Sequence, residues 1–278
     1  MQRLKSEPDL IASHAMPSPP AYRNQRLFGL DILATTFEQA VDLLCAAARR
    51  RDGRAAVVVT PNVDHIVRLD KDPAFKAAYQ QADFIFADGM PVVWASRLLG
   101  RPLPERVTGA DLFVALCQRA AQQQLRVALL GGMPGQEEML RERFARYYPG
   151  IQVDISCPSM RFDPMGAEGL AAVERIRAQQ ADIVFVCLGM PKQENWSLQH
   201  AGKFDGGIVL CVGAAMEFAL GLQKRAPLWV QRNGLEWLWR LLSNPRRMWR
   251  RYLVQDPRFA VLCWQEWRAR RQDPARDR

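Results

Sequence analysis

Between about residues 27 and 222, short apolar runs alternate with longer amphipathic segments. Runs of about four to six apolar residues suit buried strands, and the amphipathic segments have the apolar spacing of helices. Alternation of this kind is typical of a parallel sheet covered by helices. The sequence therefore predicts an α/β, Rossmann-like fold with a mostly parallel sheet. The expected strands are 56–59, 84–86, 127–130, 183–187 and 208–212, and the expected helices include 37–50, 73–81, 110–123, 136–147 and 166–178.

Each expected strand is followed by a turn rich in Gly, Pro or small polar residues. In an open parallel sheet these turns lie along one edge, where ligands bind beyond the carboxyl ends of the strands. Gly lets the backbone approach a phosphate, and the next helix offers free N–H donors. Together the turns predict a cleft for a nucleotide or sugar phosphate. They are Thr60-Pro61-Asn62, Asp88-Gly89-Met90-Pro91, 131–135, 189–194 and Gly213-Ala214-Ala215.

Several common functions are disfavoured by what the sequence lacks. The first strand–helix turn has no GxGxxG fingerprint and the chain has no Walker A motif, which argues against dinucleotide cofactors and against kinases or ATPases. The six cysteines are scattered without a CxxC pair, and the three histidines are isolated, so neither disulfides nor a zinc site are indicated. We therefore expect no cofactor and no metal.

The ends of the chain differ from its centre. Residues 1–26 are rich in Pro and Ser and contain no apolar segment of the length of a signal peptide, so we expect a disordered tail and a cytoplasmic protein. No run reaches the roughly 18 apolar residues of a membrane span. We expect a catalytic domain over residues 27–225 and a helical appendage over 226–278.

Positive charge is concentrated at the end of the chain. Residues 224–278 hold 14 of the 38 Lys and Arg but only 5 of the 29 Asp and Glu, so their net charge of +9 equals that of the whole chain. The same segment holds six of the eight tryptophans, and Pro245 and Pro257 are expected to divide it into short helices. A neutral body with a basic, aromatic end predicts an anionic partner for that end.

Several long motifs resemble, in the right order, the WecG/TagA/CpsF family of bacterial glycosyltransferases (glycosyltransferase family 26). The resemblance covers roughly residues 27–260. Its motifs are Thr60-Pro61-Asn62-Val63-Asp64-His65, Ala87-Asp88-Gly89-Met90-Pro91, Leu103-Pro104-Glu105-Arg106-Val107-Thr108-Gly109, Gly189-Met190-Pro191-Lys192-Gln193-Glu194, Arg225-Ala226-Pro227, Gly234-Leu235-Glu236-Trp237 and Arg251-Tyr252.

The resemblance implies inverting, metal-independent transfer of a hexose from a UDP-sugar to a polyprenyl-diphosphate-linked sugar. N-acetylmannosamine and glucose are both in the range of donors, and the acceptor sugar and final polysaccharide stay open. Such chemistry needs a base for the acceptor hydroxyl and positive groups for the departing diphosphate. The resemblance also implies a C-terminal appendage that completes the site and meets the membrane, which places the protein peripherally on the inner face of the cytoplasmic membrane.

Asp88 is the expected general base, because it ends an apolar strand immediately before Gly89 and matches the aspartate to which the resemblance gives this role. A side chain at this position is also able to cap the turn from Gly89 to Pro91, and position alone does not separate the two roles.

Other short polar and basic residues are candidates for binding the donor. Thr60 and Asn62 are able to orient the sugar or its phosphates, or else to cap the helix that begins near Val63. Arg106 and Thr108 are expected to face the site by resemblance, with a bidentate phosphate contact for the guanidinium; a surface ion pair with Glu105 or Asp111 is the alternative.

The turn after the strand at 183–187 supplies two more candidates. Lys192 is placed to neutralise a diphosphate, and Gln193 to hydrogen-bond the uracil or a sugar hydroxyl. For Glu194 and Trp196 we favour a helix-start and packing role. Asp70-Lys71-Asp72 spells the DxD of metal-dependent glycosyltransferases, but it precedes Pro73 and is interpreted as a turn and helix cap.

The basic tail has several possible uses. Amphipathic segments with Arg and Trp bind an anionic membrane surface, and Arg225, Arg247, Arg250 or Arg251 are candidates for a diphosphate contact. The helices alternatively pack on the core, and an appendage able to leave the core would allow a homo-oligomer. A basic aromatic tail also suits nucleic acid, but nucleic-acid binding does not explain the cleft motifs, so we expect no nucleic-acid partner.

Overall fold

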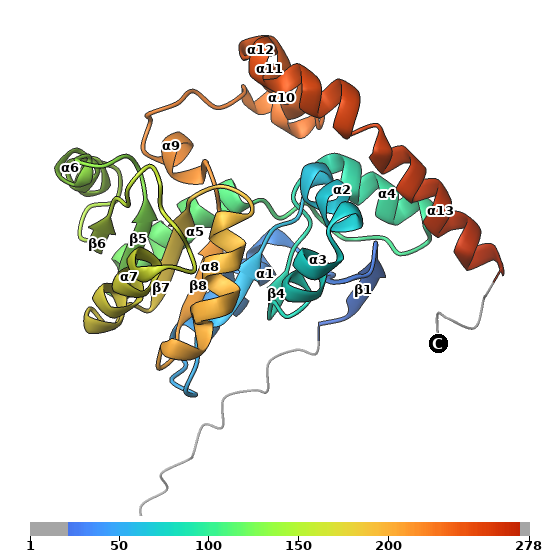
Figure 1. The fold of residues 1–278 in the computed structure, drawn as a ribbon. Helices are drawn as coiled ribbons and strands as arrows, with labels where there is room; N and C mark the ends of the chain where they lie inside the picture. Colours follow the sequence, from blue (N-terminus) through green and yellow to red (C-terminus); the bar gives the residue numbers. More distant parts are fainter. Residues whose placement is uncertain (1–21, 273–278) are drawn as a thin grey trace, which may run out of the picture.

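The computed structural model describes residues 22–272, without the side chains of Leu228, Arg232 and Arg247, and its centre is a six-stranded parallel sheet (Figure 1). The strand order β4-β3-β8-β7-β5-β6 confirms the α/β prediction, and all the pairings are parallel. The strands are β3 Ala56–Val59, β4 Phe84–Ile85, β5 Arg126–Gly131, β6 Gln152–Ser156, β7 Ile183–Cys187 and β8 Ile208–Cys211.

Helices cover both faces of this sheet because the central strands are apolar on both sides. One face packs against α1, α5 and α6, and the other against α2, α3 and α4 at one end and α7 and α8 at the other. The helices are α1 Phe37–Ala48, α2 Val63–Lys71, α3 Pro73–Tyr79, α4 Met90–Leu98, α5 Gly109–Gln123, α6 Glu137–Tyr147, α7 Ala167–Ala178, α8 Lys192–His200 and the short α9 Ala215–Ala219.

A small antiparallel hairpin precedes the sheet. Its strands are β1 Asn24–Leu27 and β2 Leu30–Leu33, and Phe28 and Gly29 form the turn with φ of 54° and 79°. Positive φ at both turn positions matches the twist of a tight hairpin. Residues 1–21 of the expected N-terminal tail lie outside the described residues, and β1 takes in its last three positions.

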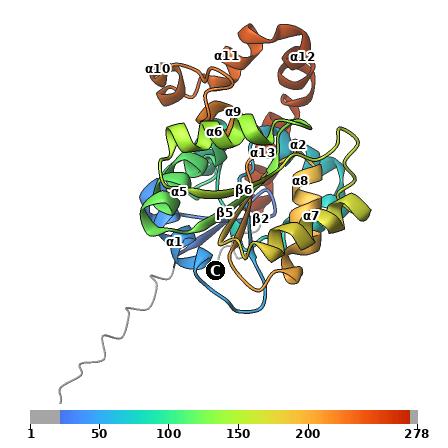
Figure 2. The same ribbon diagram turned by 90° about the vertical axis from the view of Figure 1, so that its left-hand side faces the viewer.

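The C-terminal segment is helical and has two parts, which lie in different places relative to the body (Figures 1 and 2). Short helices lie above the carboxyl ends of the strands, and a longer helix, α13, runs back along the body. The segments are α10 Leu228–Arg232, α11 Glu236–Ser243, α12 Pro245–Trp249, a π-helical stretch Arg250–Gln255 and α13 Arg258–Gln272. Pro245 and Pro257 divide the segment as predicted.

The final helix α13 packs on the body. Phe259 is buried, its ring lies 5.2 Å from that of Phe28, and Glu266 accepts a hydrogen bond of 2.6 Å from the Phe28 N–H. The segment before it is different, because Trp229, Trp249 and Leu242 are among its most exposed large side chains. The packing alternative therefore holds for one side of α13, while exposed apolar side chains lie on the overhanging helices α10–α12 and also at Leu253, Val254 and Trp264 further along.

One stability prediction follows from a close backbone approach at the amino edge of the sheet. A Cβ on Gly206 would lie 2.1 Å from the Arg50 carbonyl oxygen, whereas a Cβ on Gly202 would meet nothing within 4 Å. We expect Gly206→Ala to lower the free energy of unfolding by about 1–3 kcal/mol, because the backbone has to move. Gly202→Ala should change it by less than about 0.5 kcal/mol, and urea denaturation of both variants measures the difference.

Candidate active site

The loops at the carboxyl edge converge on Asp88. The Asp88 N–H donates to the Pro61 carbonyl at 3.0 Å, and its Oδ2 accepts from the Gly109 N–H at 3.4 Å. The Thr60 hydroxyl lies 3.0 Å from where a Cβ on Gly109 would sit, so a larger residue there would press on it. The turns after β3 and β4 and the start of α5 therefore meet at this edge, where the sequence predicted a cleft.

The surroundings of the Asp88 carboxylate favour its protonated form. Burial raises the pKa of Asp88 above that of a free aspartic acid, and the charge of Glu236 adds to this. Arg240, Arg106 and the Gly109 N–H lower the pKa, but together they do not cancel the effect of burial. The turn-capping alternative is not seen, because α4 begins at Met90 and no side chain caps it at Gly89, its N-cap residue. Asp88 is thus a carboxylate whose affinity for a proton is increased.

Two arginines and two carboxylates join the body to the overhanging helices beside Asp88. Glu236, in the first turn of α11, accepts from Arg106 at 2.8 Å and from Arg225 at 3.2 Å. Arg225 also donates to Asp111 at 2.5 Å, and Arg106 lies 3.8 Å from the same carboxylate. The ion-pair alternative for Arg106 is therefore present with Asp111, while Glu105 accepts instead from the Phe37 N–H.

The same network sets the ionisation of Asp111. Burial alone would raise its pKa, but hydrogen bonds from Arg225 and Thr108 and the charges of Arg225 and Arg106 lower it overall. Thr108 caps α5 by accepting from the Asp111 N–H at 3.0 Å, and it donates to the Asp111 carboxylate at 2.7 Å. Asp111 therefore stays negative and holds Arg225 at the rim of the site.

Asn62 and Gln193 both take part in hydrogen bonds among the turns at this edge. Asn62 caps α2, since its Oδ1 accepts from the N–H groups of Asp64 and His65. Gln193 is almost fully buried; its Oε1 accepts from the Gly213 N–H at 2.9 Å and its Nε2 donates to Glu194 at 2.8 Å. The capping role that the sequence allowed for Asn62 is thus present, and Gln193 also ties the β7 turn to the β8 turn.

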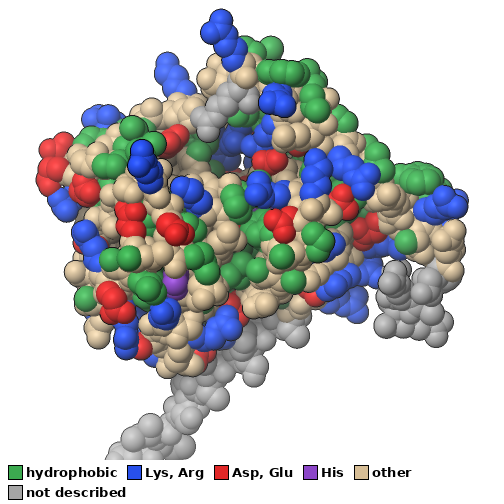
Figure 3. Space-filling model, viewed as in Figure 1, with side chains coloured by type: hydrophobic (Ala, Val, Ile, Leu, Met, Phe, Trp, Pro, Cys, Tyr) green, Lys and Arg blue, Asp and Glu red, His purple; other side chains and the backbone are tan. Residues whose placement is uncertain are grey.

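The remaining basic candidates have different partners in the structure. Arg251 forms an ion pair of 3.3 Å with Asp64 and comes within 3.5 Å of the Asn62 Oδ1. Lys192 donates to the Phe162 carbonyl at 2.9 Å, so its ammonium is held by the loop before α7. Arg250 is exposed, and the side chain of Arg247 lies outside the described residues. Figure 3 shows basic side chains around a hollow between the body and the overhanging helices.

Sequence reasoning missed the contribution of Arg240. Its guanidinium lies 5.4 Å from the centroid of the Phe218 ring, and it is the first of the positive charges that lower the pKa of Asp88. Glu236 and Arg240 are four residues apart, and both belong to α11. An i,i+4 pair in the first helix after a quoted motif is a signal that the sequence already contained.

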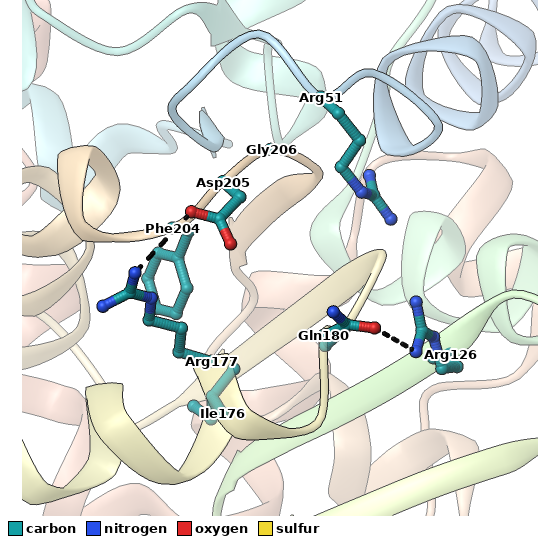
Figure 4. A pocket seen from close by; sticks show the side chains of 9 residues that line it. Arg51, Arg126, Ile176, Arg177, Gln180, Phe204, Asp205 and Gly206 are labelled. Carbon is teal, nitrogen blue, oxygen red and sulfur yellow. Dashed lines mark hydrogen bonds and ion pairs between the residues drawn. The ribbon is translucent and has the colours of Figure 1, made fainter.

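A cavity lies at the other edge of the sheet (Figure 4). It has a volume of about 310 Å³ and is lined by Arg51, Arg126 and Arg177. Arg51 donates to the carbonyls of Ala48, the last residue of α1, and of Arg50 just beyond it. It also pairs with Asp182, and Arg177 lies in the last turn of α7. Arginines at helix C-termini offset the negative end of the helix dipole, so this cavity is explained without a ligand.

The DxD sequence is structural. Asp72 caps α3 by accepting from the Phe75 N–H at 3.0 Å, and Asp70 forms an ion pair of 3.0 Å with Arg258 of α13. Within residues 22–272, no group of three or more His, Cys, Asp or Glu side chains is arranged to hold a metal ion. In the same residues, no helix combines the length and apolar character that crossing a bilayer requires.

Comparison with known proteins identifies the family. The model of the glycosyl transferase WecG/TagA/CpsF family matches residues 25–273. A protein of Bacillus spizizenii (strain ATCC 23059 / NRRL B-14472 / W23) is 34% identical over 216 residues, which are 78% of this chain and 81% of that protein. A protein of Staphylococcus aureus (strain MW2) is 29% identical over 224 residues, or 81% of this chain and 86% of that protein. Both are named N-acetylglucosaminyldiphosphoundecaprenol N-acetyl-beta-D-mannosaminyltransferase. The chain belongs to the WecG/TagA/CpsF family of glycosyltransferases.

Proposed function

We propose that the protein transfers a hexose of the N-acetylmannosamine or glucose type from a UDP-sugar to a polyprenyl-diphosphate-linked sugar, with inversion and without a metal. The observation that carries this is a carboxylate with a raised pKa, Asp88, within reach of the charges of Arg240 and Arg106 at the carboxyl edge of the sheet. The names of the two relatives also support it, because they describe the transfer of a sugar to a diphosphoundecaprenol-linked acceptor. The product is an intermediate in the synthesis of a cell-surface polysaccharide.

In the proposed reaction Asp88 takes the proton of the acceptor hydroxyl. The acceptor oxygen attacks the anomeric carbon from the face opposite the diphosphate, a new glycosidic bond forms, and the bond from that carbon to the diphosphate oxygen breaks. The electron pair of the broken bond leaves with UDP. A carboxylate with a raised pKa suits this step, because its affinity for the proton is higher than that of a free aspartate.

The departing UDP is stabilised by positive groups of the body and the overhanging helices. We assign this role to Arg106 and Arg225, with Arg251 nearer to Asn62, because charge-assisted bonds to phosphate oxygens are strong and directional. Glu236 and Asp111 hold the arginines while no diphosphate is bound. Thr60, Asn62, Thr108 and Gln193 line or support the donor pocket, and Lys192 is a less direct candidate.

The proposal is tested with purified protein, a UDP-hexose series and a polyprenyl-diphosphate-sugar analogue. We expect stoichiometric UDP release and a lipid-linked product whose mass increases by one hexose unit, with the rate unchanged by EDTA. Detection of free sugar in place of the lipid-linked product would indicate a hydrolase. A rate that disappears with EDTA and returns with Mg²⁺ or Mn²⁺ would contradict metal independence.

The pH dependence of transfer follows from the raised pKa of Asp88. The base works only when ionised, so kcat/KM should fall as the pH drops through this pKa. Because the pKa is raised, the fall should occur at a higher pH than the ordinary value for aspartate, about 3.9. A profile of kcat/KM from pH 3.5 to 8.5 measures it, and an apparent pKa at or below the ordinary value of about 3.9 would contradict an elevated pKa for the base.

We further propose that the overhanging helices hold the enzyme peripherally on the inner face of the cytoplasmic membrane. The exposed side chains of Trp229 and Trp249 and the arginines of the same segment support this. We expect cosedimentation with vesicles containing anionic phosphatidylglycerol, reduced by Trp229→Ala together with Trp249→Ala. Equal binding by that double variant would contradict the assignment, and a gel shift with nucleic acid would favour the other use of a basic tail.

A further inference from the structure

The inference concerns a buried carboxylate on α8 that the proposed reaction does not use. Glu194 lies in the first turn of α8 and its side chain is fully buried. Its Oε1 accepts from the Gln193 Nε2 at 2.8 Å and lies 3.3 Å from the His65 Nε2. Within the described residues, its Oε2 has no hydrogen-bond partner. A buried carboxylate with few partners is costly, so its location calls for a physical account.

Both contacts of Glu194 lead to side chains at the proposed donor pocket. On one side the His65 Nε2–H is able to donate to Glu194, and the His65 Nδ1 then accepts from the Asn62 backbone N–H at 3.5 Å, next to the Asn62 Oδ1 at 3.0 Å. On the other side Gln193 connects Glu194 to the Gly213 N–H at 2.9 Å. This chain of contacts therefore connects the turns after β3, β7 and β8, which are neighbouring strands in the sheet.

Chemistry fixes the orientation of the Gln193 amide within this chain. An ionised Glu194 only accepts hydrogen bonds, so it requires the NH₂ end of the amide. The Gly213 N–H only donates, so it requires the carbonyl end. Rotating the amide by 180° would break both bonds and bury two mismatched pairs. The orientation is therefore set by Glu194 and Gly213 together.

An apolar side chain would not give the same result. Trp196 and Ser197 on the same helix are fully buried, so α8 already packs on the sheet without the carboxylate. Replacement of buried ionic groups by apolar ones is often neutral or stabilising for the fold. A carboxylate at this point fixes the orientation of its neighbours, because it accepts from both Gln193 and His65, which belong to two different turns.

We infer that Glu194 is a positioning residue that orients Gln193 directly, and Asn62 through His65, toward the UDP-sugar donor. This inference rests on the proposed function. Glu194 acts through other residues and touches no reacting atom, so its loss should weaken donor binding more than it slows the chemical step. Glu194→Gln is the sharpest variant, because it keeps the shape while its own amide is able to turn and present NH₂ groups to Gln193.

For Glu194→Gln we expect the KM of the UDP-sugar and the Kd of UDP to rise about tenfold, as the loss of one well-oriented hydrogen bond would produce, with kcat changed less than about twofold. Ser197→Ala is the matched control. It is buried one turn further along α8, and its hydroxyl accepts from the Cys211 thiol at 3.3 Å and not from a residue of the Glu194 chain. It should leave KM and kcat unchanged. A KM like that of the wild type for Glu194→Gln, or an equal loss in both variants, would overturn the inference.

A second measurement separates this inference from the proposed function. The side-chain NH₂ signals of Gln193 and Asn62 in ¹⁵N NMR report their orientation without any substrate. In Glu194→Gln both pairs should shift or broaden, and His65→Gln should affect Asn62 more than Gln193. Unchanged signals would overturn the positioning role even if transfer is observed. If the signals change but the protein neither binds UDP nor transfers sugar, Glu194 orients the two amides, but the amides do not serve to bind a UDP-sugar. If Glu194→Gln does not fold, His65→Gln tests the Asn62 arm by the same signals.

Discussion

Asp88→Asn is expected to lower the kcat of sugar transfer by about 10²–10⁴-fold, the usual contribution of a general base. The amide cannot accept the proton of the acceptor hydroxyl, yet it keeps the size of the carboxylate and an oxygen for the Gly109 N–H. UDP binding should change little, because the diphosphate contacts are assigned to other residues. Single-turnover transfer and UDP titration calorimetry measure the two effects separately.

Loss of folding would not account for this result. The folded-state pKa of Asp88 is raised, so its ionised form is disfavoured by folding and its contribution to stability falls as the pH rises through that pKa. Asp88→Asn should therefore be at least as stable as the wild type at neutral pH. Asp70→Asn is a matched control within the DxD sequence and should retain activity. Retained transfer in Asp88→Asn would remove this residue from the role of base.

Arg225→Ala is expected to raise the KM of the UDP-sugar by about 10–100-fold, since a hydrogen bond to a charged group contributes about 1.5–3 kcal/mol. The variant removes a guanidinium that we assign to the donor diphosphate. It also leaves the carboxylates of Asp111 and Glu236 beside the site without one of their positive partners. Like charges near the phosphates add to the loss. Initial rates over a range of donor concentrations provide the measurement.

Two further variants determine whether charge or geometry matters at this position. Arg225→Lys keeps the charge but loses the planar fork, so its KM should lie between those of the wild type and Arg225→Ala. Arg177→Ala removes an arginine from the cavity at the opposite edge and should have no effect on KM. An unchanged KM in Arg225→Ala, or a raised KM in Arg177→Ala, would contradict the assignment of the diphosphate site.

The central strands were predictable because local sequence determines them. Ala56–Val59 and Ile183–Cys187 are short apolar runs bounded by turns, and the predicted limits match the structure. The edge strand β6, Gln152–Ser156, was missed because polar residues interrupt it and only Ile155 is fully buried. The hairpin of β1 and β2 was also missed, since its turn uses Phe28 at positive φ in place of the usual Asn or Gly.

The site was predictable only in part, for a similar reason. Thr60 directly follows β3 and Asp88 comes three residues after β4, so their place at the carboxyl edge follows from the topology. The contact of His65 with Glu194 joins residues 129 positions apart, and that of Arg106 with Glu236 joins residues 130 positions apart. Pairings at this separation depend on how the helices pack. The tail illustrates the same limit, because composition alone did not separate the packed α13 from the exposed helices before it.

A crystal structure of the protein with UDP bound tests the central claim most directly. We predict the diphosphate in the hollow between the body and α11, bonded to Arg106 and Arg225, with Asp88 facing the position of the transferred sugar. UDP bound in the cavity of Arg51, Arg126 and Arg177, or at the carboxyl edge with Asp88 turned away from the diphosphate, would contradict it.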